Sequence, residues 1–258
     1  MEFEAFIGIL IPFLGTTLGA ATVFFLKKMG ERLSAALGGF AAGVMIAASV
    51  WSLLIPAIEW SASLGVLSPL PAVIGFAFGI AFFLVLDRII PHLHYDGRAE
   101  GPKSQFCKNT KLTLAVAMHN LPEGVAVGIV YAWLLSGGGS VSAATALALS
   151  IGVGIQNFPE GAIISLPLAA AGESRLAAFY KGTASAVVET LGALLALALT
   201  SVFLPILPYL LGFAAGAMIY VVVEELIPES SSLGHSNLVT VFFAVGFLVM
   251  MALDILLG

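Results

Sequence analysis

Long apolar stretches follow one another along most of the chain. A helix needs about 20 apolar residues to cross the hydrocarbon core of a bilayer. Stretches of that kind occupy approximately 3–26, 34–56, 69–90, 111–135, 142–168, 176–202, 204–228 and 236–257. Runs such as Ala143-Ala-Thr-Ala-Leu-Ala-Leu lack the alternation of a β-barrel strand. The pattern predicts an all-α, polytopic membrane protein with eight spans, forming one transmembrane domain over residues 1–258.

The composition agrees with a protein that lives in lipid. Hydrophobic residues make up 60% of the chain and charged residues 10%, whereas soluble domains average roughly 45–50% and about 25%. The net charge of −5 leaves no basic face for nucleic acid. A single cysteine, Cys107, excludes both a disulfide framework and a cysteine-rich zinc site. The expected solvent is therefore the bilayer.

The basic residues indicate how the chain is oriented. All of them fall in or beside the loops after spans one, three and five: Lys27, Lys28, Arg32, Arg88, Arg98, Lys103, Lys108, Lys111, Arg175 and Lys181. Loops rich in lysine and arginine stay in the cytoplasm, so both termini are expected outside. The longest polar loop, about 91–110, is then cytoplasmic. Its histidines, His92 and His94, are taken by themselves as solvated side chains.

Two internal repeats occur in helices of opposed direction. Gly39-Phe-Ala-Ala-Gly-Val-Met-Ile in span two recurs as Gly212-Phe-Ala-Ala-Gly-Ala-Met-Ile in span seven. His119-Asn-Leu-Pro-Glu-Gly in span four is matched by Gln156-Asn-Phe-Pro-Glu-Gly in span five. Small residues that pack helices closely could explain the first pair, but not the matched polar and proline positions of the second. Repeats of opposed orientation are typical of transporters whose site lies at the membrane midplane.

Three carboxylates are expected at bilayer depth without a basic partner. Glu123, Glu160 and Glu189 lie near the middles of spans four, five and six, where an ionised side chain costs at least roughly 2.5–3.5 kcal/mol. Either they keep their protons or a cation joins them. His119 and Gln156 each precede a glutamate by one helical turn and share its face. Imidazole, carboxylate and amide ligands suit Zn²⁺, Mn²⁺ or Fe²⁺ and disfavour Cu(I), so these residues predict a transition-metal site.

Acidic residues near both membrane faces extend this hypothesis to a pathway. The outer side carries Glu59 and Asp254, and the inner side carries Asp87, Glu224 and Glu225, with His92 and His94 beyond them. Each acid taken singly is typical of a solvated interfacial group. Met45 in span two adds a thioether that could reach the metal or simply pack. Pro122 and Pro159 lie inside spans, where each either kinks its helix or frees a carbonyl for a polar cavity.

At the paired hexads the sequence resembles the Zrt/Irt-like (ZIP) family of divalent-metal transporters, in its bacterial, GufA-like branch. The resemblance implies a three-two-three arrangement, with spans one to three and six to eight as inverted repeats around spans four and five. It also implies a metal site formed by Met45, His119, Glu123, Gln156, Glu160 and Glu189. An adjacent second site would use Asn120, Asn157 and the shared glutamates. Gln156 and Asn157 depart from the His and Asp of other members, which leaves the number of bound ions open.

The expected function is uptake of a divalent metal, with zinc first and Cd²⁺, Fe²⁺ and Mn²⁺ as further substrates, by alternating access and without a catalytic cofactor. A cation/proton antiporter is the alternative, although it leaves His119 and the doubled hexads unexplained. An intramembrane metalloenzyme is disfavoured because the chain has no His-Glu-x-x-His or Gly-x-Ser-x-Gly motif. The resemblance places the protein in a bacterial inner membrane, with lipid and metal ions as partners; a homodimer is left open.

Overall fold

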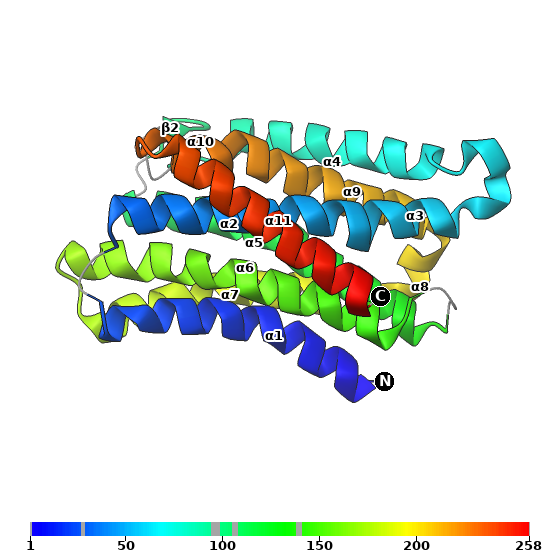
Figure 1. The fold of residues 1–258 in the computed structure, drawn as a ribbon, viewed down its shortest axis with the longest axis horizontal. Coiled ribbons are helices and arrows are strands. Elements are labelled where there is room, and N and C mark those ends of the chain that lie inside the picture. The colour runs from blue at the N-terminus through cyan, green and yellow to red at the C-terminus, as the bar shows by residue number, and fades with distance from the viewer. Residues whose placement is uncertain (1, 27–28, 94–98, 105–107, 138–140, 258) are drawn as a thin grey trace.

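Long helices running roughly along one axis make up most of the computed structural model (Figure 1). Its described backbone comprises residues 2–26, 29–93, 99–104, 108–137 and 141–257. Within these ranges, the side chains at positions 2, 93, 99, 100, 108–113, 115–117 and 119 lie outside the described part.

The long helices follow the expected spans closely. Their bounds are α1 (Glu2–Ala21), α2 (Glu31–Ala48), α4 (Leu70–Ile89), α5 (Lys108–Leu135), α6 (Ala143–Ala170), α7 (Arg175–Ala198), α9 (Leu207–Val221) and α11 (Ser236–Leu257). Shorter helical elements are η1 (Thr22–Phe24), η2 (Ser49–Leu54), α3 (Ile55–Trp60), η3 (Ala62–Leu67), α8 (Thr200–Phe203), η4 (Leu204–Ile206), η5 (Val222–Leu226) and α10 (Ile227–Ser232). Two short strands, β1 (His92–Leu93) and β2 (Ala99–Glu100), pair antiparallel in the loop that the sequence predicts to be simply polar.

Seven helical segments among the described residues are long and apolar enough to cross a membrane. The remaining expected span, 111–135, falls within the 28 residues of α5. Within that span, the fully described part is Asn120–Leu135, which is an apolar helix shorter than the other seven. The described residues thus support a polytopic helical protein, and the count of eight spans stays a prediction.

Serine caps define where two of the site-bearing helices begin. Ser142 accepts a hydrogen bond from the backbone N–H of Thr145, and Ser174 accepts one from Ala177. Such caps satisfy N–H groups that have no partner inside the first turn. The prolines at 122 and 159 lie inside continuous α5 and α6. Both hexads are therefore presented on unbroken helices.

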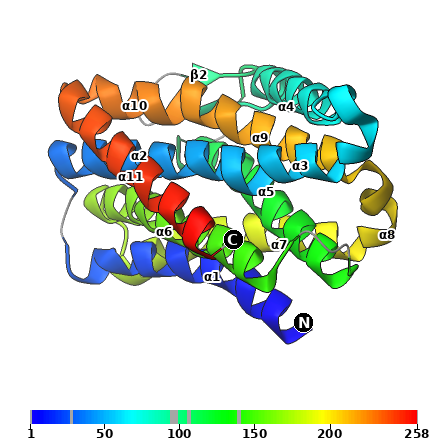
Figure 2. The same ribbon diagram turned by 45° about the vertical axis from the view of Figure 1, so that its right-hand side comes forward.

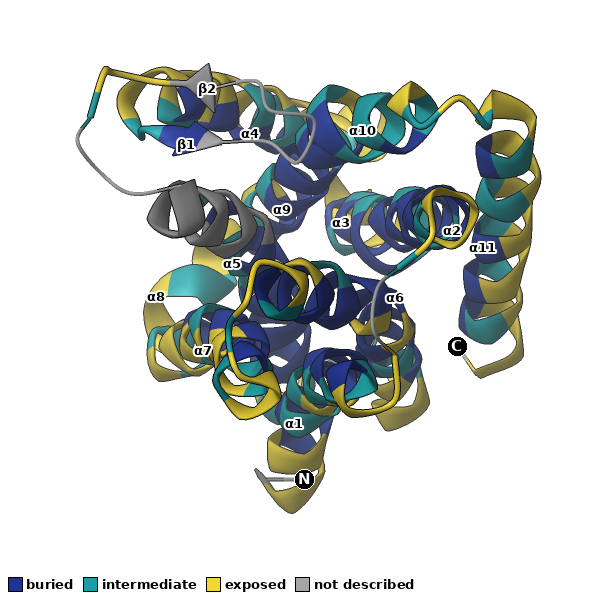
Figure 3. Cartoon of the chain, turned by 90° about the vertical axis from the view of Figure 1, so that its left-hand side faces the viewer, coloured by how far each residue is buried: buried dark blue, intermediate teal, exposed yellow. Residues whose placement is uncertain are grey.

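The helices pack into two groups, visible in the end-on view of Figure 3. We call α1, α5, α6 and α7 the site bundle, and α2, α4, α9 and α11 with their short extensions the support bundle. In the site bundle α1 packs on α6 and α5 on α7, and in the support bundle α2 packs on α11 and α4 on α9. The bundles meet where α2 and α11 contact α6, and where α5 contacts α9.

Glycines bring the paired helices of the support bundle into close contact. A Cβ on Gly39 would lie 2.5 Å from the carbonyl oxygen of Val239, and one on Gly212 would lie 2.3 Å from that of Ala72. Gly39 and Gly212 are the first residues of the two copies of the span-two repeat. The repeated sequence is therefore matched by a repeated contact, because α2 meets α11 as α9 meets α4.

Each copy of this repeat is followed by a π-helical segment. The π-helix η2 precedes Pro56 and the π-helix η5 precedes Pro228. Proline has no N–H for the regular helical bond, and a π-helical turn absorbs an extra residue; such turns are frequent at functional sites. The sequence shows the two prolines but not the change of helix type.

We expect Gly161→Val to destabilise the site bundle. A Cβ at Gly161 would lie 2.0 Å from the carbonyl oxygen of Thr16 on α1, so α1 and α6 would have to move apart at a loss of about 1–3 kcal/mol. Thermal unfolding of the purified protein in detergent measures the effect. Gly30→Val is the matched control, because a Cβ there meets no atom within 4 Å; equal unfolding temperatures for the two variants would contradict the proposed packing.

The outer surface of the helices is apolar, as lipid contact requires. In the most apolar window of α11 only 22% of residues are buried, and in that of α4 only 33%. Both termini lie at the same end of the molecule as α3 and α8, whereas β2 and α10 lie at the other end (Figures 1 and 2). We call these the terminal end and the basic end. The second name reflects its exposed bases, which are Arg32, Arg88, Lys103, Arg175 and Lys181.

Candidate metal centre

Polar side chains gather midway along three helices of the site bundle. They are Asn120 and Glu123 of α5, Gln156, Asn157 and Glu160 of α6, and Glu189 of α7. All six side chains are buried, and the most exposed of them, Glu160, reaches 9%. The sequence predicts each of these positions as a ligand, and the fold brings them together from segments as much as 69 residues apart in the chain.

The amide of Gln156 joins two of the carboxylates. Its Nε2 donates to Glu123 Oε1 at 2.9 Å and to Glu160 Oε1 at 2.5 Å. One amide group therefore uses both of its protons on the two glutamates of the paired hexads. This contact holds α5 and α6 together at the level of the site.

The two asparagines make different contacts. Asn157 Nδ2 donates to Glu189 Oε2 at 2.6 Å, which links α6 to α7. Asn120 Nδ2 donates to the backbone carbonyl of Ser185 at 3.3 Å, which links α5 to α7. Asn157 thus lies against a carboxylate, and Asn120 lies against an uncharged carbonyl.

Each of these contacts leaves a buried oxygen without a hydrogen-bond donor. Such oxygens are Asn120 Oδ1, Glu123 Oε2, Gln156 Oε1, Asn157 Oδ1 and Glu189 Oε1. A buried acceptor with no donor costs about 1–3 kcal/mol, and more when it is charged. A cation coordinated by these oxygens would remove that cost. The described lysines and arginines are exposed and lie away from the middle of the helices. None of these described basic side chains therefore pairs with the buried oxygens.

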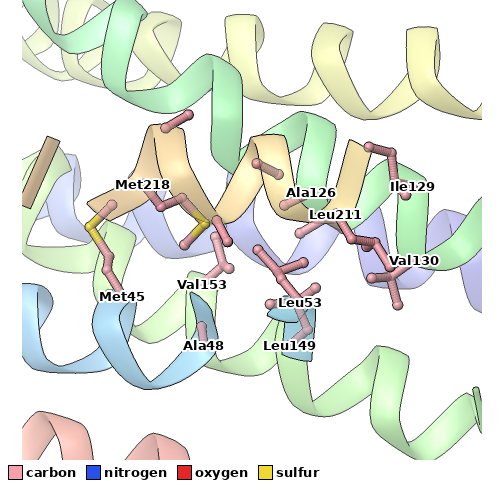
Figure 4. Close-up of a cluster of buried hydrophobic side chains, with 14 of the residues drawn as sticks. Met45, Ala48, Leu53, Ala126, Ile129, Val130, Leu149, Val153, Leu211 and Met218 are labelled. Carbon is pink, nitrogen blue, oxygen red and sulfur yellow. The ribbon is translucent and has the colours of Figure 1, made fainter. Parts of the chain in front are cut away.

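Two further predicted ligands are His119 and Met45. The side chain of His119 lies outside the described residues; the backbone of α5 carries it one turn before Glu123. Met45 is 1% exposed and belongs to a cluster of apolar side chains that also contains Met218 (Figure 4). Its role as a metal ligand stays a prediction.

A second polar group lies at the basic end. Asp87, His92 and Glu225 are all buried, and one potential ligand atom of each lies within 4.8 Å of the other two. His92 Nε2 is 4.0 Å from Asp87 Oδ1. The expectation that His92 is solvated is wrong: its exposure is 0%, because β1 packs against α5. Its Nδ1 contacts the carbonyl oxygen of Ile90 at 2.9 Å.

Two partners of the predicted acids were missed by the sequence. Tyr220 of α9 donates a short hydrogen bond to Asp87, and Ser52 of η2 donates to Asp254 Oδ1 at 2.7 Å. Asp254 is 7% exposed, so the interpretation of it as a solvated interfacial acid is wrong. Ser52 and Glu225 lie at equivalent positions after the two copies of the repeat, each 13 residues beyond its first glycine, in η2 and η5. That equivalence is the signal in the sequence that could have pointed to Ser52.

The other predicted pathway residues have simpler surroundings. Glu59 is exposed on α3, and Glu224 is half-buried on η5 beside Glu225. His94 lies outside the described residues. The structure therefore assembles three of the five residues predicted at the inner mouth.

Comparison with known proteins assigns the chain to a family. The family model described as ZIP zinc transporter matches residues 98–254. The chain belongs to the ZIP family. The match takes in α5, α6 and α7, and hence both hexads and Glu189. Divalent metal ions are therefore the substrate class of this membrane protein, and it is a transporter rather than an enzyme.

ZIP relatives in distant organisms resemble nearly the whole chain. Zinc transporter ZIP11 of Homo sapiens is 33% identical, over 99% of this chain and 98% of its own length. Zinc transporter ZIPB of Bordetella bronchiseptica is 36% identical, over 95% of this chain and 79% of its own. Zinc transporter GufA of Myxococcus xanthus is 32% identical, over 94% of each chain. The similarity thus extends beyond residues 98–254 to the helices that carry Met45, Ser52 and Asp87.

Proposed function

We propose that this protein takes up divalent transition-metal ions into the cytoplasm, with Zn²⁺ as the main substrate and Cd²⁺, Fe²⁺ and Mn²⁺ as further ones. The observation that carries the proposal is the group of buried oxygens without donors on α5, α6 and α7. Such a group is stable in lipid only when a cation enters it or its acids are neutralised. The names of the ZIP relatives add zinc as the leading metal.

The proposed ligands of the central site are His119, Glu123, Gln156, Glu160 and Glu189, with the Met45 thioether completing the set. Asn120, Asn157 and the shared glutamates are the residues that an ion at an adjacent position would contact. Metal binds to deprotonated ligands, and for the amides it binds through oxygen. Gln156 now presents its nitrogen to Glu123 and Glu160. An arriving ion would take the place of that N–H group, and Gln156 would turn Oε1 toward the ion.

Acids at the two ends would lead the ion to and from this site. Glu59 and Asp254 lie toward the terminal end, which we propose faces the outside of a bacterial inner membrane. Asp87, His92 and Glu225 would receive the ion at the basic end, with Glu224 and His94 beside them. The compact inner group is what supports this exit, because carboxylate and imidazole atoms meet there within 4.8 Å.

The region between the bundles supports a state that is closed to the outside. Toward the terminal end, the contact between the bundles is filled by apolar side chains, which are Leu53, Ala126, Ile129, Val130, Leu149, Val153 and Leu211 (Figure 4). Toward the basic end, a cavity of about 230 Å³ opens between α2, α6 and α10, and Glu31, Ser34 and Glu229 are among its lining residues. We place the exit of the ion at the basic end, where this cavity and the group of Asp87, His92 and Glu225 both lie.

The repeated packing supports an inverted repeat as the basis of alternating access. Exchanging α1 for α7, α2 for α9, α4 for α11 and α5 for α6 converts each main helix pair into another observed pair. The proposed metal ligands from 119 to 189 all lie on the site bundle, whereas Asp87, Glu225 and Asp254 lie on the support bundle. Movement of one bundle along the other would carry the ion between the two mouths.

Uptake by liposomes tests the proposal. The purified protein is reconstituted, and a fluorescent indicator inside reports Zn²⁺, Cd²⁺, Fe²⁺, Mn²⁺ or Na⁺ added outside. We expect uptake of Zn²⁺ and of at least one other divalent ion, and none of Na⁺. Uptake of Na⁺ alone, or of no divalent ion, would refute it.

A further inference from the structure

The contact between Asn157 and Glu189 bears on how many ions the central site holds. Asn157 Nδ2 donates to Glu189 Oε2 at 2.6 Å, and the two side chains are 0% and 2% exposed. A hydrogen bond to an ionised carboxylate is roughly twice as strong as one between neutral groups. The carboxylate of Glu189 is therefore already stabilised by an uncharged donor, at the oxygen that faces α6.

The charge of the site points the same way. Glu123, Glu160 and Glu189 together carry −3 when ionised, and the described basic side chains are exposed at the end of the molecule. One bound divalent ion brings the net charge of the site to −1, and a second ion brings it to +1. A buried charge without a partner is strongly destabilising. With one ion bound, the excess negative charge is stabilised by the N–H group that Asn157 donates to Glu189. With two ions bound, the excess positive charge would be stabilised only by the neutral amide oxygens of the described site residues.

The two amides differ in what an ion would displace. Gln156 spans Glu123 and Glu160, so the first ion replaces its N–H between two carboxylates and gains both. Asn157 contacts only one carboxylate, that of Glu189. A second ion would therefore break this hydrogen bond and gain only one carboxylate in exchange.

We propose that Asn157 makes the central site a one-ion site: the ion binds between Glu123 and Glu160, and the Asn157 amide stabilises Glu189 in place of a second ion. This inference rests on the proposed function, because it concerns the same metal centre. The missing fourth carboxylate then sets the stoichiometry: an acid at residue 157, or at residue 156, would give a neutral site for two ions, with −4 balanced by +4.

Equilibrium binding of Cd²⁺ to the purified full chain in detergent tests this. Every variant in this experiment, and the reference protein with Asn157, also carries Asp87→Asn and Glu225→Gln. These two changes prevent the inner group from binding Cd²⁺ and adding to the number of ions measured. We expect one Cd²⁺ per chain with Asn157 and two with Asn157→Asp. Asn157→Leu removes the hydrogen bond without adding charge, so it should bind one ion, more weakly. Gln156→Glu also adds a fourth carboxylate, and it should bind two if Asn157→Asp does not fold.

The outcomes separate this inference from the proposed function. Two ions with Asn157 in place, or one ion in both Asn157→Asp and Gln156→Glu, would overturn the one-ion site while leaving a metal centre. No Cd²⁺ bound with Asn157 in place would overturn the metal centre itself. Thr190→Val is the matched control beside Glu189, because the Thr190 hydroxyl donates to its own helix at Ala186; it should bind one ion.

Discussion

Replacing His119 and Glu123 together with alanine should abolish Zn²⁺ uptake by liposomes. Glu123 is fully buried and contacts Gln156 through one oxygen, while its other oxygen has no donor. Its loss removes one of the two carboxylates between which the ion is proposed to bind. Loss of residues that merely support a metal ligand already costs about 10–100-fold, so loss of two ligands should reduce initial uptake by about 100-fold or more.

This prediction needs a variant that preserves the packing of α5. Glu123→Gln keeps the size of the side chain and removes only the charge, and we expect a comparable loss of uptake with normal thermal unfolding. Glu173→Gln is the matched control, because Glu173 forms an exposed ion pair with Lys181 away from the centre; it should transport normally. Normal uptake by the alanine double variant would remove the proposed site.

Cross-linking the two bundles at the terminal end should stop transport. Trp60 of α3 and Trp133 of α5 meet edge to face, with ring centroids 5.0 Å apart. One belongs to the support bundle and the other to the site bundle. If the bundles move past each other during transport, a covalent bridge between these positions holds the state that is closed to the outside. We expect uptake to fall to background after cross-linking.

The measurement uses Trp60→Cys and Trp133→Cys in a chain whose one cysteine is removed by Cys107→Ser. Uptake is measured before and after a short bifunctional thiol reagent, and again after reduction, which should restore it. A bridge within the site bundle is the control: Tyr131 and Ser150 share a 3.2 Å hydrogen bond between α5 and α6, and cysteines there should cross-link without loss of uptake. Full activity in the bridged Trp60–Trp133 protein would contradict relative movement of the bundles.

Much of the helical layout could be predicted because lipid makes local sequence decisive. A span must satisfy its own backbone hydrogen bonds and present apolar side chains outward. Its position can therefore be recognised from a run of consecutive apolar residues. The bounds of α4 and α11 fall within a residue or two of the predicted spans. The change to π-helix before Pro56 and Pro228 could not be predicted, because it depends on how neighbouring helices accommodate the extra residue.

The inner group shows the corresponding limit for the site. Asp87 and Glu225 were predicted near one membrane face, but their contact depends on the packing of α4 against α9. The burial of His92 depends on a pair of two-residue strands that no pattern indicated. Tyr220 reads as an ordinary aromatic residue of an apolar helix until that packing places its hydroxyl against Asp87. Such partners are far apart in the chain, and sequence periodicity reports only neighbours on one element.

By itself, the sequence determined the membrane environment, most spans, the basic end and the residue types of the proposed metal centre. Those properties follow from hydropathy, from the placement of charge and from the spacing of residues on single helices. Only the tertiary structure decided which atom of each polar side chain meets which partner. It turned the nitrogens of Gln156 and Asn157 toward carboxylates and left their oxygens without donors. These hydrogen bonds depend on how closely α5, α6 and α7 approach one another, and on the free-energy cost of burying a polar atom without a partner.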